Sequence, residues 1–157
     1  MNDVFFRICQ WLDENGIAYR LANHAETRTS EEAAQARGEP LEIGGKAIVM
    51  KADDGFGLFV LGAHLKVDSG TIKRHLQAKK LRFATPEELL KLTGLVPGSV
   101  PPFGRPILPF DLYVDPSVIE NEKLAFNAGS LTDSIIMSTH DYQSVAGATM
   151  FRFAKSA

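Results

Sequence analysis

Apolar residues follow a helical period at the start of the chain and shorter, strand-like patterns in much of the rest. Within residues 3–14 the apolar positions fall on one helical face: Val4, Phe5, Ile8, Trp11 and Leu12. Gly16 follows them as a stop signal. This segment therefore predicts an amphipathic helix.

Polar capping residues predict four more helices. The clearest start is Thr85-Pro86-Glu87-Glu88, which combines a cap, a proline in the first turn and acids near the positive end of the helix dipole. Gly94 predicts the end of that helix. The other three are expected from Thr29 or Ser30 to about Arg37, from Asp68 or Ser69 through a basic run, and over residues 139–145.

Short runs between these helices predict strands. They cover residues 17–21, 46–52, 57–62, 81–84, 112–114, 124–126, 135–138 and 149–153. The turn Asp53-Asp54-Gly55 predicts a hairpin between the second and third of them. No repeat or long linker divides the chain. Residues 1–157 are therefore expected to form a single compact α/β (α+β) domain, with a mixed, largely antiparallel sheet covered by helices.

Composition is that of an ordinary globular protein, with 45% hydrophobic and 23% charged residues. The single cysteine, Cys9, excludes an internal disulfide and a cysteine-rich zinc site, and its apolar neighbours favour a core position. The N-terminal segment lacks the apolar stretch of a signal peptide, and no run approaches the length of a membrane span. The expectation is a cytoplasmic protein without a membrane partner.

Charge is unevenly distributed, although the net charge is only −2. The segment from Lys66 to Arg82 carries a net +5 and the remainder −7. A local basic face can bind a phosphate backbone even on an acidic protein. The candidates for contact with tRNA are Lys73, Arg74, Lys79 and Lys80. The alternative is a solvated helix surface.

Three segments carry polar or conformationally special residues that packing alone does not require. In GGKAIVMKADDG, Lys46 and Lys51 lie five residues apart on one strand and therefore on opposite faces, so at least one faces inward or into a groove. The segment GLVPGSVPPFG, residues 94–104, can present fixed backbone groups to a ligand. In FNAGSLTDSIIMS, residues 126–138, a polar turn joins two strands. Each segment taken alone also fits a structural role.

The order and combination of these segments resemble the YbaK/ProX family and the editing insertion of bacterial prolyl-tRNA synthetases. The similarity includes His24 followed by a Thr/Ser-capped helix, and it spans about residues 18–153. Its most specific part is the proline–glycine loop. The resemblance implies a metal-independent, cofactor-free hydrolase that removes a small amino acid, such as Ala, Ser or Cys, from mischarged tRNA, with tRNA for proline as the expected substrate.

The resemblance also implies roles for individual residues. Lys46 would hold the terminal adenosine or phosphate and orient the ester, and backbone groups around Gly94 and Gly98 would take part in catalysis. The expected substrate-binding residues are His24, Lys51, Pro101, Pro102, Phe103, Gly104, Asn127, Gly129 and Ser130. Asn127 departs from the family, because several members carry a histidine there. Phe103 and Met137 are candidate pocket walls.

Residue chemistry gives no sign of a different hydrolytic mechanism. No Ser-His-Asp or Cys-His set is evident, and the four histidines lack metal-ligand spacing. Water positioned by backbone groups of the 94–104 loop, with positive charge from Lys46, is the expected mechanism. The alternative is an inactive tRNA-binding or regulatory module of the same fold. A transient contact with a synthetase or elongation factor is a further expectation.

Overall fold

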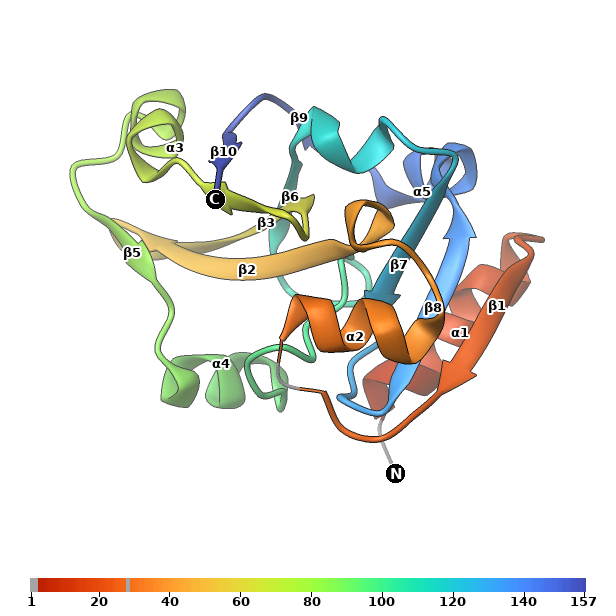
Figure 1. Ribbon diagram of the computed structural model, residues 1–157. Helices are drawn as coiled ribbons and strands as arrows, with labels where there is room; N and C mark the ends of the chain where they lie inside the picture. The colour runs from red at the N-terminus through yellow and green to blue at the C-terminus, as the bar shows by residue number, and fades with distance from the viewer. Residues whose placement is uncertain (1–2, 28) are drawn as a thin grey trace.

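A five-stranded sheet forms the centre of the computed structural model, which describes residues 3–27 and 29–157 (Figure 1). Its strands, in spatial order, are β5 (Leu81–Phe83), β2 (Gly45–Ala52), β3 (Gly55–Gly62), β6 (Asp111–Val114) and β9 (Thr149–Met150). The hairpin β2–β3 is antiparallel, as is the short pairing of β5 with β2. The pairings β3–β6 and β6–β9 are parallel. The sheet is therefore mixed.

Two smaller sheets complete the β structure of the described chain. The first is antiparallel, with strands β1 (Tyr19–Asn23), β8 (Asp133–Ser138) and β7 (Lys123–Asn127) in that order. The second pairs β4 (Leu65–Val67) with β10 (Ala154–Ser156). Gly44 and Ala125 form an isolated bridge between the start of β2 and β7. A Cβ on Gly45 would lie 2.7 Å from Leu124 Cδ1, so the Leu124 side chain occupies the space that Gly45 leaves open.

Helices flank the sheets, and their ends follow from their capping residues. They are α1 (Asp3–Glu14), α2 (Ser30–Arg37), α3 (Ser69–Leu76), α4 (Pro86–Thr93) and α5 (Thr139–Ala146), with short 3-10 turns at Leu41–Ile43 and Pro116–Ile119. Thr29 and Thr85 each form a capping box with the glutamate three residues later. In Figure 1, α2 lies below β2 and α3 lies above the far end of that strand.

The core has two parts, separated by the hairpin β2–β3. Leu58 and Val60 of β3 belong to the larger cluster, whereas Phe59 and Leu61 belong to the smaller one with Ile72 of α3. Alternate side chains of a strand point to opposite faces, so β3 is buried on both of its faces. This explains why its sequence reads as an almost unbroken apolar run.

The structure confirms the predicted fold class. Five of the seven strand pairings in the described residues are antiparallel, and all five predicted helices are present. The predicted strand over 149–153 was too long, and strands β4 and β10 were missed. None of the helices described is long and apolar enough to cross a membrane. That the whole of residues 1–157 forms one editing domain stays a prediction.

Asp115 explains where the last predicted strand breaks. Its side chain is fully buried, and Oδ1 accepts the backbone N–H groups of Phe153 (2.7 Å) and Ala154 (2.8 Å), while Oδ2 accepts that of Ser117 (2.9 Å). Burial raises the pKa of the carboxyl, but these hydrogen bonds outweigh burial and hold the pKa below its usual value. The carboxylate thus takes the place of a strand partner for residues 153 and 154.

Replacing Asp115 with alanine is expected to lower the free energy of unfolding by about 3 kcal/mol, because two buried N–H groups and one partly buried N–H group lose their acceptor. The folded pKa lies below the unfolded one, so this contribution is present above the unfolded pKa and is lost as pH falls through the folded pKa. Urea titrations of parent and variant at pH 7 and at about pH 3 should therefore show a shrinking difference. Asp111→Ala, at an exposed ion pair with Arg105, is the control and should stay near the parent. Equal losses in the two variants at pH 7 would contradict this role.

Candidate functional site

A cleft of about 240 Å³ opens where α2 meets the start of β2. Five stretches of the chain form its walls. The lining residues are Thr27, Thr29, Ser30, Ala33, Arg37, Gly45, Lys46, Ala47, Ile48, Ala63, Gly98, Val100 and Asn127. The cleft thus brings together Lys46, Gly98 and Asn127, one residue from each of the three segments that the sequence singled out.

One wall of the cleft is an open strand edge. Strand β5 pairs only with Met50–Ala52 of β2, and the last contact on that side is the bond from Ala84 N–H to the Val49 carbonyl (2.9 Å). Backbone groups alternate in direction along a strand, so the N–H and C=O of Ala47 point to the same side as those of Val49. No described strand pairs with Ala47 there. Ala47 therefore offers a backbone donor and acceptor to a ligand.

Lys46 lies next to this strand edge and lines the cleft, and its side chain is half-buried. Burial lowers the pKa of its ammonium group, and the charge of Glu31 opposes that shift only in part. Strand alternation places Lys51 on the other face of β2, where its Nζ lies 5.8 Å from the centre of the Phe56 ring. The two lysines thus occupy opposite faces, as predicted, and only Lys46 lines the cleft.

The loop that contributes Gly98 is a tight turn over residues 96–99. Pro97 is its second residue and Gly98 its third, with a φ of 88° that favours glycine. Ser99 N–H donates to the Val96 carbonyl (3.1 Å), and the Ser99 hydroxyl donates to the same oxygen (2.7 Å). Asn127 Nδ2 donates to the Gly98 carbonyl (2.7 Å) from outside the turn. The position of the Gly98 carbonyl is therefore fixed from both sides.

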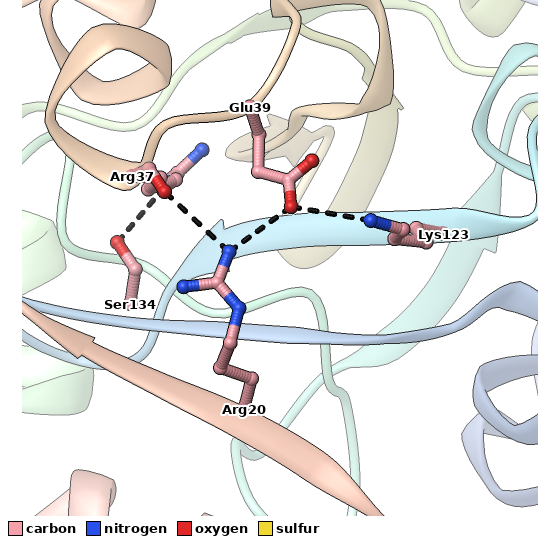
Figure 2. A network of polar contacts seen from close by, with 5 residues as sticks. All are labelled: Arg20, Arg37, Glu39, Lys123 and Ser134. Atoms are coloured by element: carbon pink, nitrogen blue, oxygen red, sulfur yellow. Dashed lines mark hydrogen bonds and ion pairs between the residues drawn. The ribbon is translucent and has the colours of Figure 1, made fainter.

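Asn127 belongs to a polar network centred on Arg37 and Ser134, and Figure 2 shows the contact between these last two residues. Arg37 donates from Nε to Ser134 Oγ (2.8 Å) and from Nη2 to Asn127 Oδ1 (2.9 Å). The Ser134 hydroxyl also lies 3.1 Å from Asn127 Oδ1. Because Asn127 Oδ1 accepts from these donors, its Nδ2 is directed to Gly98. Arg37 thereby orients the amide that holds the loop.

His24 joins the same network from the end of β1. Its Nε2 lies 2.9 Å from Ser134 Oγ, and its Nδ1 lies 2.9 Å from the Ala25 carbonyl. A carbonyl oxygen only accepts, so Nδ1 is the donor in the contact with Ala25. His24 therefore supports Asn127 through Ser134 and does not itself line the cleft. The neighbouring Arg28, which is part of the segment expected to follow His24, lies outside the described residues.

Arg37 is a site residue that the sequence did not reveal. Its exposed fraction is only 8%, and burial lowers the pKa of the guanidinium to about 10. A basic residue at the end of a helix usually reads as a solvated, dipole-stabilising cation. The available signal was spacing: Ala33 and Arg37 lie four residues apart on one helical face, and Ala33 is buried. A small residue there leaves room for the longer side chain beneath the helix.

Much of the proline–glycine loop proves to be structural. Gly94 caps α4 in the left-handed conformation, and a Cβ on Gly104 would lie 2.5 Å from the Phe110 carbonyl oxygen. Pro101 and Pro102 are buried, and the Pro102 carbonyl accepts the Tyr142 hydroxyl (2.6 Å). None of these four residues lines the cleft. The sequence predicted a rigid loop but not which of its residues face a ligand.

The expected aromatic and turn residues also pack elsewhere. Phe103 and Met137 are core residues rather than cleft walls, with exposed fractions of 1% and 3%. Gly129 lies against α1, where a Cβ would come within 2.9 Å of Val4 Cγ1. Ser130 hydrogen-bonds Thr132 within its own turn. These four residues therefore stabilise the core or a turn, an alternative that the sequence left open.

The basic segment is exposed on α3 and the loop after it. Lys73, Arg74, Lys79 and Lys80 all have exposed side chains. The backbone N–H groups of the last two bind the Asp53 carboxylate, which fixes the loop (2.9–3.3 Å). Arg82, by contrast, is neutralised by a two-point ion pair with Glu88. In the described residues no group of three His, Cys, Asp or Glu side chains could hold a metal ion.

Comparison with known proteins places the cleft in a recognised domain type. Residues 24–145 match the profile of the aminoacyl-tRNA editing domain, and this range contains every residue that lines the cleft. The chain is 33% identical, over 158 aligned residues, to the multifunctional Ser/Thr-tRNA deacylase ProXp-y of Escherichia coli K12. That alignment covers 96% of this chain and 93% of the relative.

Two further similarities extend the comparison. A proline–tRNA ligase from Shouchella clausii is 34% identical over 103 residues, which cover 66% of this chain but only 18% of the ligase. The crystal structure of a proposed trans-editing enzyme for prolyl tRNA synthetase superposes with a TM-score of 0.84 and 26% identity, over 99% of both chains. The similarity thus covers both stand-alone proteins and one part of a larger enzyme.

Proposed function

This chain belongs to the aminoacyl-tRNA editing domain family, and we propose that it is a trans-editing deacylase for seryl and threonyl esters on mischarged tRNA. The observation that carries the proposal is the cleft, where Lys46, the fixed Gly98 carbonyl and the open edge of β2 meet. The relative that acts on Ser- and Thr-tRNA aligns along almost the whole chain. This supports serine and threonine as the amino acids removed.

The chemistry of the cleft wall supports a hydroxyl-bearing amino acid. Thr27, Thr29 and Ser30 place three hydroxyl-bearing residues along one side. The Thr29 hydroxyl caps α2, whereas Thr27 Oγ1 is buried and has no hydrogen-bond partner in the described chain. Buried polar groups are normally hydrogen-bonded. A serine or threonine side chain can supply the missing partner and an alanine side chain cannot.

Hydrolysis of the ester needs an oriented water molecule and stabilisation of the oxyanion that develops on the carbonyl oxygen. Lys46 supplies positive charge from a half-buried position, where charge acts more strongly than in bulk water. The Gly98 carbonyl, held by Asn127, accepts a hydrogen bond from the attacking water or from the ribose hydroxyl next to the ester. The N–H of Ala47 is a second fixed donor along the strand edge.

The basic segment supports tRNA docking on the face of β2 from which Lys46 reaches the cleft. By alternation Lys46 shares its face with Ile48 and Met50, and Met50 packs in the cluster that contains Ile72 of α3. The exposed cations of α3 and of the following loop thus flank the same face of the sheet. A tRNA backbone bound there would lead its acceptor end toward the cleft. A preference for tRNA for proline, and transient contact with a synthetase or elongation factor, stay predictions.

A panel of mischarged tRNAs tests the proposed function. Seryl- and threonyl-tRNA should be deacylated well above the spontaneous rate, and alanyl-tRNA at least about tenfold more slowly than seryl-tRNA, because the hydroxyl partner is missing. Thr27→Val keeps the shape of the wall and should reduce the difference between seryl and alanyl esters. The measurement is loss of the labelled amino acid from tRNA over time. If no ester is cleaved above the spontaneous rate, the chain is a binding module instead.

Replacing Lys46 with alanine should lower the deacylation rate by about a hundredfold, the usual effect of removing one preorganised oxyanion-stabilising group. The thermal midpoint should stay near that of the parent, because Lys46 makes no hydrogen bond or ion pair with the described residues. Lys51→Ala is the matched control on the opposite face and should be mild. If Lys51→Ala lost activity while Lys46→Ala kept it, Lys51 and not Lys46 would be the lysine that stabilises the oxyanion.

Charge reversal at Lys73, Arg74, Lys79 and Lys80 should weaken tRNA affinity and flatten its dependence on salt. Each phosphate contact that is lost should lower the slope of log K against log salt by about one unit. The single-turnover rate at saturating protein should change little, because these residues lie outside the cleft. Lys91→Glu on α4 controls for net charge when it is compared with each single reversal. An unchanged salt slope would assign the four residues to a solvated surface.

A further inference from the structure

Arg37 carries a buried charge that forms no ion pair with any residue that the structure describes. Its two hydrogen-bonding nitrogens, Nε and Nη2, bind the neutral oxygens of Ser134 and Asn127. No carboxylate lines the cleft. A buried ion normally requires a paired ion of opposite sign. The positive charge of the guanidinium therefore lacks a counter-ion among the described residues of the free protein.

The carboxylate of Glu39 pairs with other cations and not with Arg37. Glu39 follows α2 directly, but its Oε1 binds Arg20 Nη2 (3.0 Å) and Lys123 Nζ (3.3 Å), as Figure 2 shows. Arg20 also donates to the backbone carbonyl of Arg37 (3.4 Å), not to its side chain. Met1, Asn2 and Arg28, which lie outside the described residues, carry no side-chain carboxylate.

The third nitrogen of Arg37, Nη1, is the one that Ser134 and Asn127 leave without a hydrogen bond. Nη1 makes no hydrogen bond within the described chain, and the absent Cβ of Gly44 would lie 3.6 Å from it. The same Cβ position is 3.0 Å from Ala63, which lines the cleft. Two small residues thus border the free side of the guanidinium. Arg37 and Lys46 together give the cleft two cations and no anion.

We propose that Arg37 binds the phosphate of the 3′-terminal nucleotide of the tRNA through Nη1, while Nε and Nη2 keep hold of Ser134 and Asn127. The proposal rests on the function proposed above, because the phosphodiester is the anionic group nearest the ester in that substrate. The α-ammonium group of the amino acid has the wrong sign. Since Asn127 also holds the Gly98 carbonyl, the same arginine links the phosphate subsite to the loop that faces the ester.

Binding of fragments tests the proposal without any turnover, so it is independent of whether deacylation is found. Adenosine 5′-monophosphate, adenosine and inorganic phosphate are titrated into the protein and followed by NMR. The parent should bind the monophosphate at least about tenfold more tightly than adenosine, the value of one charge-assisted hydrogen-bonded contact. Inorganic phosphate alone should compete with the monophosphate but bind more weakly, which separates a free-anion site from a nucleotide subsite.

Arg37→Met should abolish the preference for the monophosphate, and Arg37→Lys should keep part of it because the charge remains. Arg152→Ala, at an exposed position, is the charge-matched control and should bind as the parent does. The thermal midpoint of Arg37→Met should be unchanged or raised, since Ser134 still bonds Asn127 and His24 and an unpaired buried charge is removed. A purely structural arginine would instead give a lowered midpoint with fragment binding intact in the folded fraction. Equal binding of adenosine and its monophosphate by the parent, or a preference that survives in Arg37→Met, overturns the proposal.

Discussion

The close approach of β2 to β7 is the contact on which the site depends. Gly44 bridges Ala125, and Gly45 lies where a Cβ would overlap the Leu124 side chain. A side chain at position 45 would require the buried Leu124 side chain to shift. Because the two strands touch here, Lys46 of one sheet and Asn127 of the other line the same cleft. Two glycines that contribute no functional group thus help to set the geometry of the cleft.

On the other side of the cleft, a network of hydrogen bonds between polar groups makes the structure rigid. The turn at residues 96–99 is closed by its own serine, and the carbonyl it presents is held by Asn127, which is oriented in turn by Arg37 and Ser134. These residues come from the loop, α2, β7 and β8. Networks of this kind fix positions well because each member is constrained by at least two others. The backbone carbonyl is therefore placed by the tertiary fold and not by the loop sequence alone.

Local signals in the sequence were enough for the helices, the hairpin and the placement of the two lysines on opposite faces. The caps at Thr29 and Thr85 determine where helices begin, and an odd spacing on an unbroken strand puts Lys46 and Lys51 on opposite faces. Features that depend on distant partners were missed. Arg37 is buried by residues 90 and 97 positions away in sequence, and β10 exists because Ala154 pairs with Val67. In the proline–glycine loop, rigidity was predictable, whereas the contacts of Phe103 and Gly104 were not.

The short length of β5 has a consequence for the behaviour of the protein at high concentration. An apolar strand with one edge unpaired is a template on which a second chain can add a strand, and this is a common route to aggregation. Here the open part of β2 is flanked by α2, and it begins with a charged side chain. An intruding strand would have to bury that charge and displace the helix. Lys46 thus also protects the open edge of β2 against pairing with another strand.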